Sequence, residues 1–596
     1  MKTFLRILRL IGGYKWLMAA GLAFSVLQMG LSIAMVEIMR RVIDQAIRGG
    51  DHRLLGVYSF ILLGAGLLRF GAYVGRRLTT GKVSHGAEYD LRNRVWAHLL
   101  RQPLAYFDRW QTGQLMSRVM ADVGNVRMFL GYGLVMFTTS LLYLVTVPVR
   151  LFVMNWRLAL ISLAFFPALL LVTGRFSRRL HPVLREVQQK IADVTTAAEE
   201  NVTGLRIVKI FAREEDELAK FSERSTRVFE ASVAAARLRA VYIPLIGFLP
   251  NIAVVTLLWY GGRQVINGSL SIGSFVAFNS YLMMLVGPAQ TLGWLTSLGQ
   301  RSIASGERVF EILDAPLEMT ERPDARPLAA PQGAVTFEGV SFSYPEREVL
   351  AGIDLEIPAG KTIALVGHTG CGKTTLTNLI PRFYDSTRGR VLVDGQDVRE
   401  LTFTSLRSHI GIVNQDPFLF SASIAENIRF GRPQASDAEV LAAATRAQAD
   451  VFISALPEGY ETVIGERGLT LSGGQRQRIA IARALVMDPK ILILDDATSS
   501  VDIETETRIR EALVEVMRER TTVIIAHRPS TIALAEEIIV LDHGRIVERG
   551  RHDELISGDT VYARMFGRAE VECCTLDEVA ADALDVADLP PSEAGV

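Results

Sequence analysis

Residues 367–374 read Gly-His-Thr-Gly-Cys-Gly-Lys-Thr and directly follow the apolar run Thr-Ile-Ala-Leu-Val at residues 362–366. The octet fits the pattern Gly-x4-Gly-Lys-Ser/Thr, which binds phosphate where it joins a buried strand to a helix. Its glycines let backbone N–H groups wrap phosphate oxygens, its lysine reaches the β- and γ-phosphates, and its threonine hydroxyl suits Mg²⁺. Taken alone, the pattern leaves a chance glycine-rich loop as the alternative.

A second apolar run ends in two carboxylates. Residues 491–496 read Ile-Leu-Ile-Leu-Asp-Asp, which predicts a buried strand that delivers Asp495 to a metal at the carboxyl edge of a sheet. Residues 522–526 form another buried-strand candidate, and helical stretches alternate with these runs. The pattern predicts an α/β P-loop ATPase domain that takes ATP and Mg²⁺.

A glycine-rich helix start lies between these strands. Residues 471–478 read Leu-Ser-Gly-Gly-Gln-Arg-Gln-Arg and open a helix that continues to residue 485. A helix N-terminus with two glycines presents N–H groups and a positive dipole end to an anion. The segment resembles the signature of ATP-binding-cassette (ABC) proteins. The resemblance implies that two cassettes sandwich two ATP molecules, each signature meeting the γ-phosphate of ATP held by the opposite subunit.

Other motifs of the family follow in the family's order. Tyr344 resembles the aromatic residue that stacks on adenine, Gln415 the glutamine that meets Mg²⁺ and the attacking water, and His527 the switch histidine at the γ-phosphate. Residues 465–468 resemble the element that precedes the signature in exporters. Ser499 and Asp502 resemble the loop that crosses the dimer seam.

The resemblance thus implies a full set of site residues. The ATP-binding residues are Tyr344, Gly367, His368, Thr369, Gly370, Cys371, Gly372, Lys373, Thr374 and Thr375; the signature residues are Leu471, Ser472, Gly473, Gly474 and Gln475; the Mg²⁺ ligands are Thr374, Gln415 and Asp495; the catalytic residues are Gln415, Asp496 and His527.

The first half of the chain is too apolar for a soluble domain. Hydrophobic residues make up 49% of the 596, and the mean hydropathy is +0.24. A bilayer core of about 30 Å needs about 20 apolar residues as helix. The predicted spans are residues 16–36, 54–74, 129–149, 158–174, 241–262 and 270–299. Lys+Arg and Asp+Glu are both 64, so no basic surplus indicates nucleic acid.

Charge asymmetry orients the spans. The links at residues 75–127 and 175–240 carry 22 Lys and Arg residues, against seven in the three other links. The positive-inside rule places these long links and both termini in the cytoplasm of a multi-pass protein of the cell membrane. Residues 106–118, with Asp122, and residues 200–211 resemble the two cytoplasmic arms of exporters, each of which holds a short coupling helix that docks on a cassette.

These observations predict a multi-domain membrane protein. An all-α six-helix transmembrane domain with long cytoplasmic arms spans residues 1–314, and a Pro-rich linker follows at 315–333. The nucleotide-binding domain covers residues 334–569, and residues 570–596 form an acidic tail that we expect to be disordered. Three cysteines offer no disulfide framework, which fits a reducing cytoplasmic environment.

Charged residues near the spans need separate interpretations. Arg69 lies within the second span, where a central charge costs about 2.5–3.5 kcal/mol, so it is expected to face the protein interior. It belongs there either to a structural ion pair or to the translocation path. Glu37 and Arg150 are interpreted as interfacial residues near the outer boundary.

One residue departs from the family pattern. Cassettes that hydrolyse ATP well carry Glu after the strand-end Asp, whereas this chain has Asp496. The Asp side chain is one C–C bond shorter than Glu, so its carboxylate lies about 1.5 Å further from the attacking water. A general base must come within about 2.6–3.2 Å of the group whose proton it accepts. With an intact signature, this implies the impaired member of an asymmetric bacterial heterodimer whose partner half-transporter carries Glu. The alternative is a homodimer with slow, Asp-assisted hydrolysis.

The favoured function is ATP-driven export of an amphipathic or hydrophobic substrate, such as a drug, lipid or peptide. ATP sandwiching would close the cassettes, and the arms would switch the spans between inward-open and outward-open states. Two alternatives keep the same fold: an exporter-shaped importer, for example of siderophores, and a regulatory subunit that binds ATP with little hydrolysis.

Overall fold

The computed structural model describes the chain except for residues 1, 346, 466–470, 497–509, 512 and 567–596. The predicted seam residues Ser499 and Asp502, most of the 465–468 motif and the acidic tail lie outside the described residues. The chain forms two compact units. The helical unit comprises Met1–Arg101 and Trp110–Pro316, and the sheet unit comprises Gln102–Arg109 and Leu317–Val596.

Six long helical stretches of the helical unit are apolar enough to cross a membrane: Lys2–Ile47, His52–Leu99, Thr112–Met154, Trp156–Thr203, Glu214–Ile266 and Ile272–Asp314. The predicted number of spans is confirmed: five of the predicted spans lie within these stretches, and the sixth, 270–299, begins two residues before its stretch. The stretches contain 43 to 53 residues each, which corresponds to about 65–80 Å at 1.5 Å per residue. Since about 20 residues cross a bilayer, each stretch continues well beyond it.

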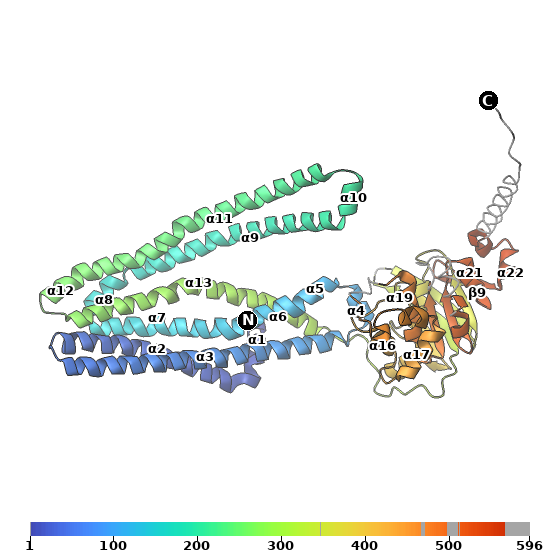
Figure 1. The fold of residues 1–596 in the computed structure, drawn as a ribbon, viewed down its shortest axis with the longest axis horizontal. Coiled ribbons are helices and arrows are strands. Elements are labelled where there is room, and N and C mark those ends of the chain that lie inside the picture. Colours follow the sequence, from blue (N-terminus) through green and yellow to red (C-terminus); the bar gives the residue numbers. More distant parts are fainter. Residues whose placement is uncertain (1, 346, 466–470, 497–509, 512, 567–596) are drawn as a thin grey trace, which may run out of the picture. The chain divides into compact units, whose positions relative to one another are not determined.

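The helical unit is built of long helices with short irregular turns between them (Figure 1). Its elements are α1 (Lys2–Arg9), η1 (Leu10–Tyr14), α2 (Lys15–Arg41), η2 (Val42–Ile47), α3 (His52–Leu99), α5 (Thr112–Ser117), η3 (Arg118–Asp122), α6 (Val123–Met128), η4 (Phe129–Gly133), α7 (Leu134–Met154), α8 (Trp156–Leu163), α9 (Phe165–Thr203), α10 (Leu205–Ile210), α11 (Glu214–Thr256), η5 (Leu257–Gly261), α12 (Gly262–Ile266) and α13 (Ile272–Asp314).

Two helix pairs dominate this unit. Helices α9 and α11 run side by side as a long hairpin with α10 at its tip, and α2 packs along α3 (Figure 1). Capping side chains start two of the longest helices. Asp51 Oδ1 accepts hydrogen bonds from the backbone N–H groups of Arg53 and Leu54 ahead of α3, and Ser271 Oγ accepts one from Ser274 ahead of α13.

The charged residues of the spans are placed only in part as expected. Glu37 accepts from Arg150 Nη2 at 3.4 Å and also pairs with Arg40. The expectation that Arg69 faces the interior is wrong for the single chain: Arg69 is exposed, with Nη1 3.9 Å from Met35 Sδ. The physical reason is that the most apolar window of this span buries none of its residues within one chain.

The sheet unit contains two sheets and the helices that cover them (Figure 1). Its strands are β1 (Val335–Tyr344), β2 (Arg347–Ile357), β3 (Thr362–Val366), β4 (Arg388–Val393), β5 (Gln396–Asp397), β6 (Ile410–Val413), β7 (Ile491–Asp495), β8 (Thr521–Ile525), β9 (Glu537–Asp542) and β10 (Arg545–Gly550). Its helices are α4 (Leu104–Asp108), α14 (Lys373–Leu379), η6 (Val398–Glu400), α15 (Phe403–Ser408), α16 (Ile424–Arg429), α17 (Asp437–Arg446), α18 (Asp450–Ser454), η7 (Gly459–Glu461), α19 (Gly473–Leu485), α21 (Pro529–Ile532) and α22 (His552–Ile556).

The larger sheet has the strand order β10-β9-β3-β8-β7-β6, and all its pairs except β10–β9 are parallel. The smaller, antiparallel sheet has the order β2-β1-β4-β5. Strands β3 and β8 are buried at every position, which fits the run of aliphatic side chains that follows the threonines at the start of each strand. The three predicted strands are confirmed, with β8 starting one residue earlier than expected. Parallel pairing brings the carboxyl ends of β3, β6, β7 and β8 to one edge.

A short helix from the first long link belongs to the sheet unit. Helix α4 lies in the segment Gln102–Arg109, and its Ala105 packs against the core beneath the smaller sheet. Tyr384 donates a hydrogen bond to Asp108 Oδ2 at 2.7 Å, and burial is the main cause that raises the pKa of Tyr384. The expectation that the first arm carries a short helix docked on a cassette is met by α4.

Candidate nucleotide site

The predicted phosphate loop joins β3 to α14. Gly367, Gly370 and Gly372 have φ values of 152°, 84° and 106°, a region that glycine adopts without a Cβ penalty. A Cβ on Gly367 would lie 2.1 Å from the Leu541 carbonyl oxygen. These positions therefore require glycine, and the loop lies directly against the backbone of β9 at Gly367.

Lys373 is held inside this loop. Its Nζ donates to the carbonyl oxygens of Gly367 at 2.7 Å and His368 at 3.1 Å, and the side chain is buried. Cys371 is also buried and fills space beside Gly367. The ammonium therefore lies where the loop would wrap a phosphate.

Two of the predicted Mg²⁺ residues, Thr374 and Asp495, meet at the carboxyl edge of the larger sheet. Thr374 Oγ1 donates to Asp495 Oδ2 at 3.3 Å. Burial raises the pKa of Asp495, while Lys373 and His527 act in the opposite direction through their charge. In the described part of the chain, no group of three or more His, Cys, Asp or Glu side chains could hold a metal unaided. The oxygen donors fit Mg²⁺ bound by a hydroxyl, a carboxylate and nucleotide phosphates.

Gln415 and Asp496 approach each other across this edge. Gln415 Nε2 donates to Asp496 Oδ2 at 3.5 Å, although the residues are 81 positions apart. Asp496 is buried, its N–H donates to the Ile525 carbonyl at 2.9 Å, and its φ is +42°. Asp tolerates this left-handed conformation better than most residues, so the backbone favours a short polar side chain here.

The remaining predicted residues flank the same edge. His527 follows β8 and is exposed. Tyr344 ends β1 and makes edge-on ring contacts with Phe342 and Tyr384, at centroid distances of 4.9 and 5.7 Å. Its ring is thus supported by two aromatic neighbours, as a stacking platform requires.

The signature forms a capped helix start. Ser472 Oγ accepts from the Gln475 N–H at 3.2 Å, and Gln475 Oε1 accepts from the Ser472 N–H at 2.9 Å. Ser472 is exposed at this N-terminus of α19. Within the described residues, none of residues 471–475 hydrogen-bonds to residues 367–375. One chain therefore does not bring its signature and its phosphate loop together by direct bonds.

Sequence reasoning missed the residues that tie the signature helix to the Gln415 segment. Gln477 Nε2 donates to the Asn414 carbonyl at 3.3 Å, and Arg483 Nη1 donates to the Phe418 carbonyl at 2.8 Å. Burial lowers the pKa of Arg483 to about 10. The sequence offered no specific signal for them: Gln477 is buried and Arg483 half-buried only because of the fold, in a helix that carries several other polar residues.

Comparison with known proteins agrees with this geometry. Residues 18–289 match the ABC transporter transmembrane region family, and residues 350–499 match the ABC transporter family. The chain is 40% identical over 523 residues to the ABC transporter ATP-binding protein YknV of Bacillus subtilis, covering 88% of this chain and 87% of the relative. The chain belongs to the ABC transporter family.

Other similarities of this ABC transporter concern exporters. It is 36% identical to an ATP-dependent lipid A-core flippase of Desulfotalea psychrophila, over 90% of this chain and 94% of that protein. A solved bacterial Atm1-family ABC exporter with ATP bound is 31% identical, with a TM-score of 0.76 over 93% of this chain and 98% of that one. The ABC transporter is thus a multi-pass membrane protein with an exporter fold and a transport ATPase domain.

The position of Lys373 leads to a first prediction. Lys373→Ala removes the main cation at the phosphate loop, so the affinity for ATP is expected to fall about 10- to 100-fold. The measurement is equilibrium binding of a fluorescent ATP analogue to the purified ABC transporter. Lys361→Ala is the matched control, because Lys361 is exposed at the opposite end of β3. Equal affinities of parent and Lys373→Ala would contradict the placement of the loop.

Proposed function

We propose that this chain is one half of a dimeric exporter that uses ATP to move an amphipathic or hydrophobic substrate across the cell membrane, with both termini in the cytoplasm. The observation that carries the proposal is the convergence of the phosphate loop, Asp495, Asp496 and Gln415 on one sheet edge, in a chain with six candidate spans. Relatives named as a lipid A-core flippase and as a putative multidrug export protein, YgaD of Bacillus subtilis, support a lipid or drug substrate.

Two features favour a dimer. The signature and the phosphate loop of one chain share no hydrogen bond within the described residues, so a second cassette is needed to complete each ATP site. The tip of the α9–α11 hairpin exposes a set of large apolar side chains: Val202, Leu205, Ile207, Ile210 and Phe211. A partner cassette would cover this tip, as the coupling-helix resemblance implies.

Each site residue then has a role. Tyr344 stacks on adenine, and residues 367–375 bind the phosphates with Lys373 at the β- and γ-phosphates. Thr374, Asp495 and Gln415 would hold Mg²⁺, which would supply positive charge at the phosphate oxygens. Asp496 accepts the proton of the attacking water, while Gln415 and His527 orient the water and the γ-phosphate.

Asp496 supports an asymmetric pair. The Asp496 side chain is one C–C bond, about 1.5 Å, shorter than a Glu side chain. Its backbone has a left-handed φ of +42°. Both features favour a weak base at this chain's own site. We therefore propose a heterodimer in which a partner half-transporter carries Glu and this chain's signature completes the partner's site.

The function is tested by transport in sealed vesicles. Inside-out vesicles that contain the assembled transporter should accumulate a fluorescent amphiphile when ATP is added, because export runs toward the vesicle lumen. Movement in the opposite direction would identify an importer. Stable ATP binding without ATPase activity or transport would identify a regulatory subunit.

A second prediction concerns the docked helix α4. Tyr384→Phe removes the hydrogen bond to Asp108, which involves a charged acceptor and contributes about 1.5–3 kcal/mol. We expect transport per ATP hydrolysed to fall several-fold, because α4 is held less firmly on the sheet unit. The measurement is the ratio of vesicle transport to ATPase rate. Arg109→Gln, which removes only the exposed pair with Glu318, should leave this ratio unchanged. An unchanged ratio in Tyr384→Phe would contradict the role.

A further inference from the structure

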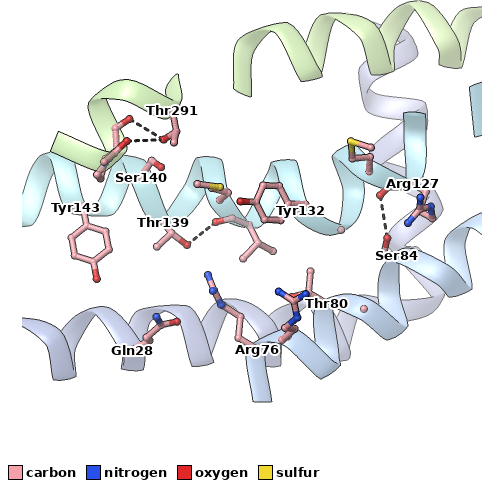
Figure 2. Close-up of a pocket in the computed structure, with 18 of the residues that line it drawn as sticks. Gln28, Arg76, Thr80, Ser84, Arg127, Tyr132, Thr139, Ser140, Tyr143 and Thr291 are labelled. Atoms are coloured by element: carbon pink, nitrogen blue, oxygen red, sulfur yellow. Dashed lines mark hydrogen bonds between the residues drawn. The ribbon is translucent and has the colours of Figure 1, made fainter. Parts of the chain in front are cut away.

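The helical unit forms an open cavity of about 640 Å³ between α2, α3, the η4–α7 segment and α13. Figure 2 shows Arg76 extending into this space, with Thr139 and Tyr143 pointing into it from α7 and Gln28 from α2. Ligand sites for small molecules have volumes of about 300–1,000 Å³, so the cavity is large enough for a ligand.

One face of α3 supplies the charged wall. Arg76, Thr80 and Ser84 recur every four residues, and Arg77, Gly81 and His85 do the same one position later. At 3.6 residues per turn both rows lie on one stripe of the helix. Arg127 adds a third guanidinium from α6, where its carbonyl accepts from Ser84 Oγ at 3.2 Å.

The positive charge of this wall is compensated only in part. No Asp or Glu lines the cavity in the described part of the chain. Glu88, nearby, contacts Arg127 Nε at 3.2 Å, Arg92 Nη2 at 2.7 Å and His85 Nδ1 at 3.4 Å, so one carboxylate serves two guanidinium groups. Neither Arg76 nor Arg77 forms an ion pair with any described carboxylate.

The opposite wall combines apolar side chains with the hydroxyl groups of Thr139, Ser140 and Thr291. Tyr132, Val135 and Met136 line it from η4 and α7, and Pro288 lines it from α13. The π-helical turn η4 brings Gly131 so close to α3 that a Cβ there would lie 2.4 Å from Ser84 Oγ. π-helical turns inside α-helices often mark functional sites. The cavity thus combines guanidinium groups on one side with a partly apolar surface on the other.

We propose that this cavity binds the phosphate or similar oxyanion group of an amphiphile, with Arg76 and Arg77 as its charge partners and the apolar part seated against the η4–α7 wall. Guanidinium groups bind phosphate through paired, charge-assisted hydrogen bonds, and an anion offsets the repulsion between neighbouring arginines. The inference rests on the proposed function, because it names the substrate class of that exporter.

A simpler interpretation is that Arg76 and Arg77 only follow the positive-inside rule, since they come just after the predicted span 54–74. Arg175 tests this interpretation. It comes directly after the predicted span 158–174, is exposed, and does not line the cavity. It thus shares the sequence position of Arg76 and Arg77 relative to a span, without their cavity.

The test is equilibrium binding to the purified transporter in phosphatidylcholine nanodiscs, without ATP and with empty nanodiscs as background. The probes are dodecyl phosphate, dodecyltrimethylammonium and inorganic phosphate. We expect saturable binding of dodecyl phosphate that the double variant Arg76→Gln, Arg77→Gln weakens at least about tenfold, whereas Arg175→Gln leaves it unchanged. Arg76→Lys with Arg77→Lys should retain part of the affinity, because the charge remains while the paired guanidinium hydrogen bonds are lost.

A charge-reversed variant separates loss of the site from loss of the fold, because it is expected to gain binding of a cation. Arg76→Glu with Arg77→Glu should bind dodecyltrimethylammonium in place of dodecyl phosphate. Equal binding of anion and cation by the parent, equal weakening by Arg175→Gln, or inorganic phosphate binding as tightly as dodecyl phosphate would each overturn the proposal. Because no ATP is present, a failure of ATP-driven transport would leave these results intact, and transport without such binding would overturn this inference alone.

Discussion

Asp496→Asn is expected to lower the ATPase rate of the assembled transporter by less than about twofold, since in the proposed heterodimer hydrolysis would run mainly at the partner's site. Replacing the partner's Glu by Gln should cost most of the about 10²–10⁴-fold that a general base supplies. The reason is the distance that the base must span: the Asp496 side chain is one C–C bond shorter than Glu, and its backbone is left-handed. The measurement is steady-state ATPase activity of the purified protein, expressed alone and together with a neighbouring half-transporter.

Two further variants sharpen this test. Asp416→Asn removes an exposed carboxylate next to Gln415 and controls for loss of negative charge near the site. Asp496→Glu restores the reach of the base at a backbone strain of about 1–2 kcal/mol, so it should raise the rate. A stable chain that hydrolyses ATP briskly by itself and loses that activity in Asp496→Asn would identify a homodimer and refute the asymmetric pair.

Turnover should be abolished by the double variant Ser472→Ala, Gly473→Glu in this chain. In the proposed dimer, a carboxylate at the N-terminus of α19 would occupy the place of the γ-phosphate and repel it, and the exposed Ser472 hydroxyl is lost. ATP binding at this chain's own phosphate loop should persist, because residues 471–475 make no hydrogen bond to it among the described residues. ATPase rate and nucleotide binding are measured on the same preparation.

Loss of a helix cap could by itself lower stability by about 1 kcal/mol, so a matched control is needed. Ser436 caps α17 with the same reciprocal pattern, its Oγ accepting from the Glu439 N–H. Ser436→Ala should show a similar change in thermal stability and full turnover. Unchanged turnover in the signature variant would mean that this signature completes no working ATP site.

Many structural elements could be predicted from short local sequence patterns. The six spans needed only apolar length, and β3, β7 and β8 needed only short buried runs, so all were found from sequence. The phosphate loop could also be predicted from the sequence, since its conformation depends on glycines within eight consecutive residues. Arg69 shows the limit of such reasoning, because its exposure depends on which helix faces remain uncovered in one chain.

The sequence by itself determined the family, the number of spans and the identity of the nucleotide motifs, because each is encoded in a short contiguous segment. Only the tertiary structure decided which distant residues meet. It placed Gln415 beside Asp496, docked α4 on the sheet unit through Asp108, and gathered Arg76, Arg77 and Arg127 around one cavity. In the sequence, these arginines contributed only to the number of positive charges that oriented the spans. Their arrangement arises from the packing of four helical segments that are far apart in the chain, and no local pattern records such packing.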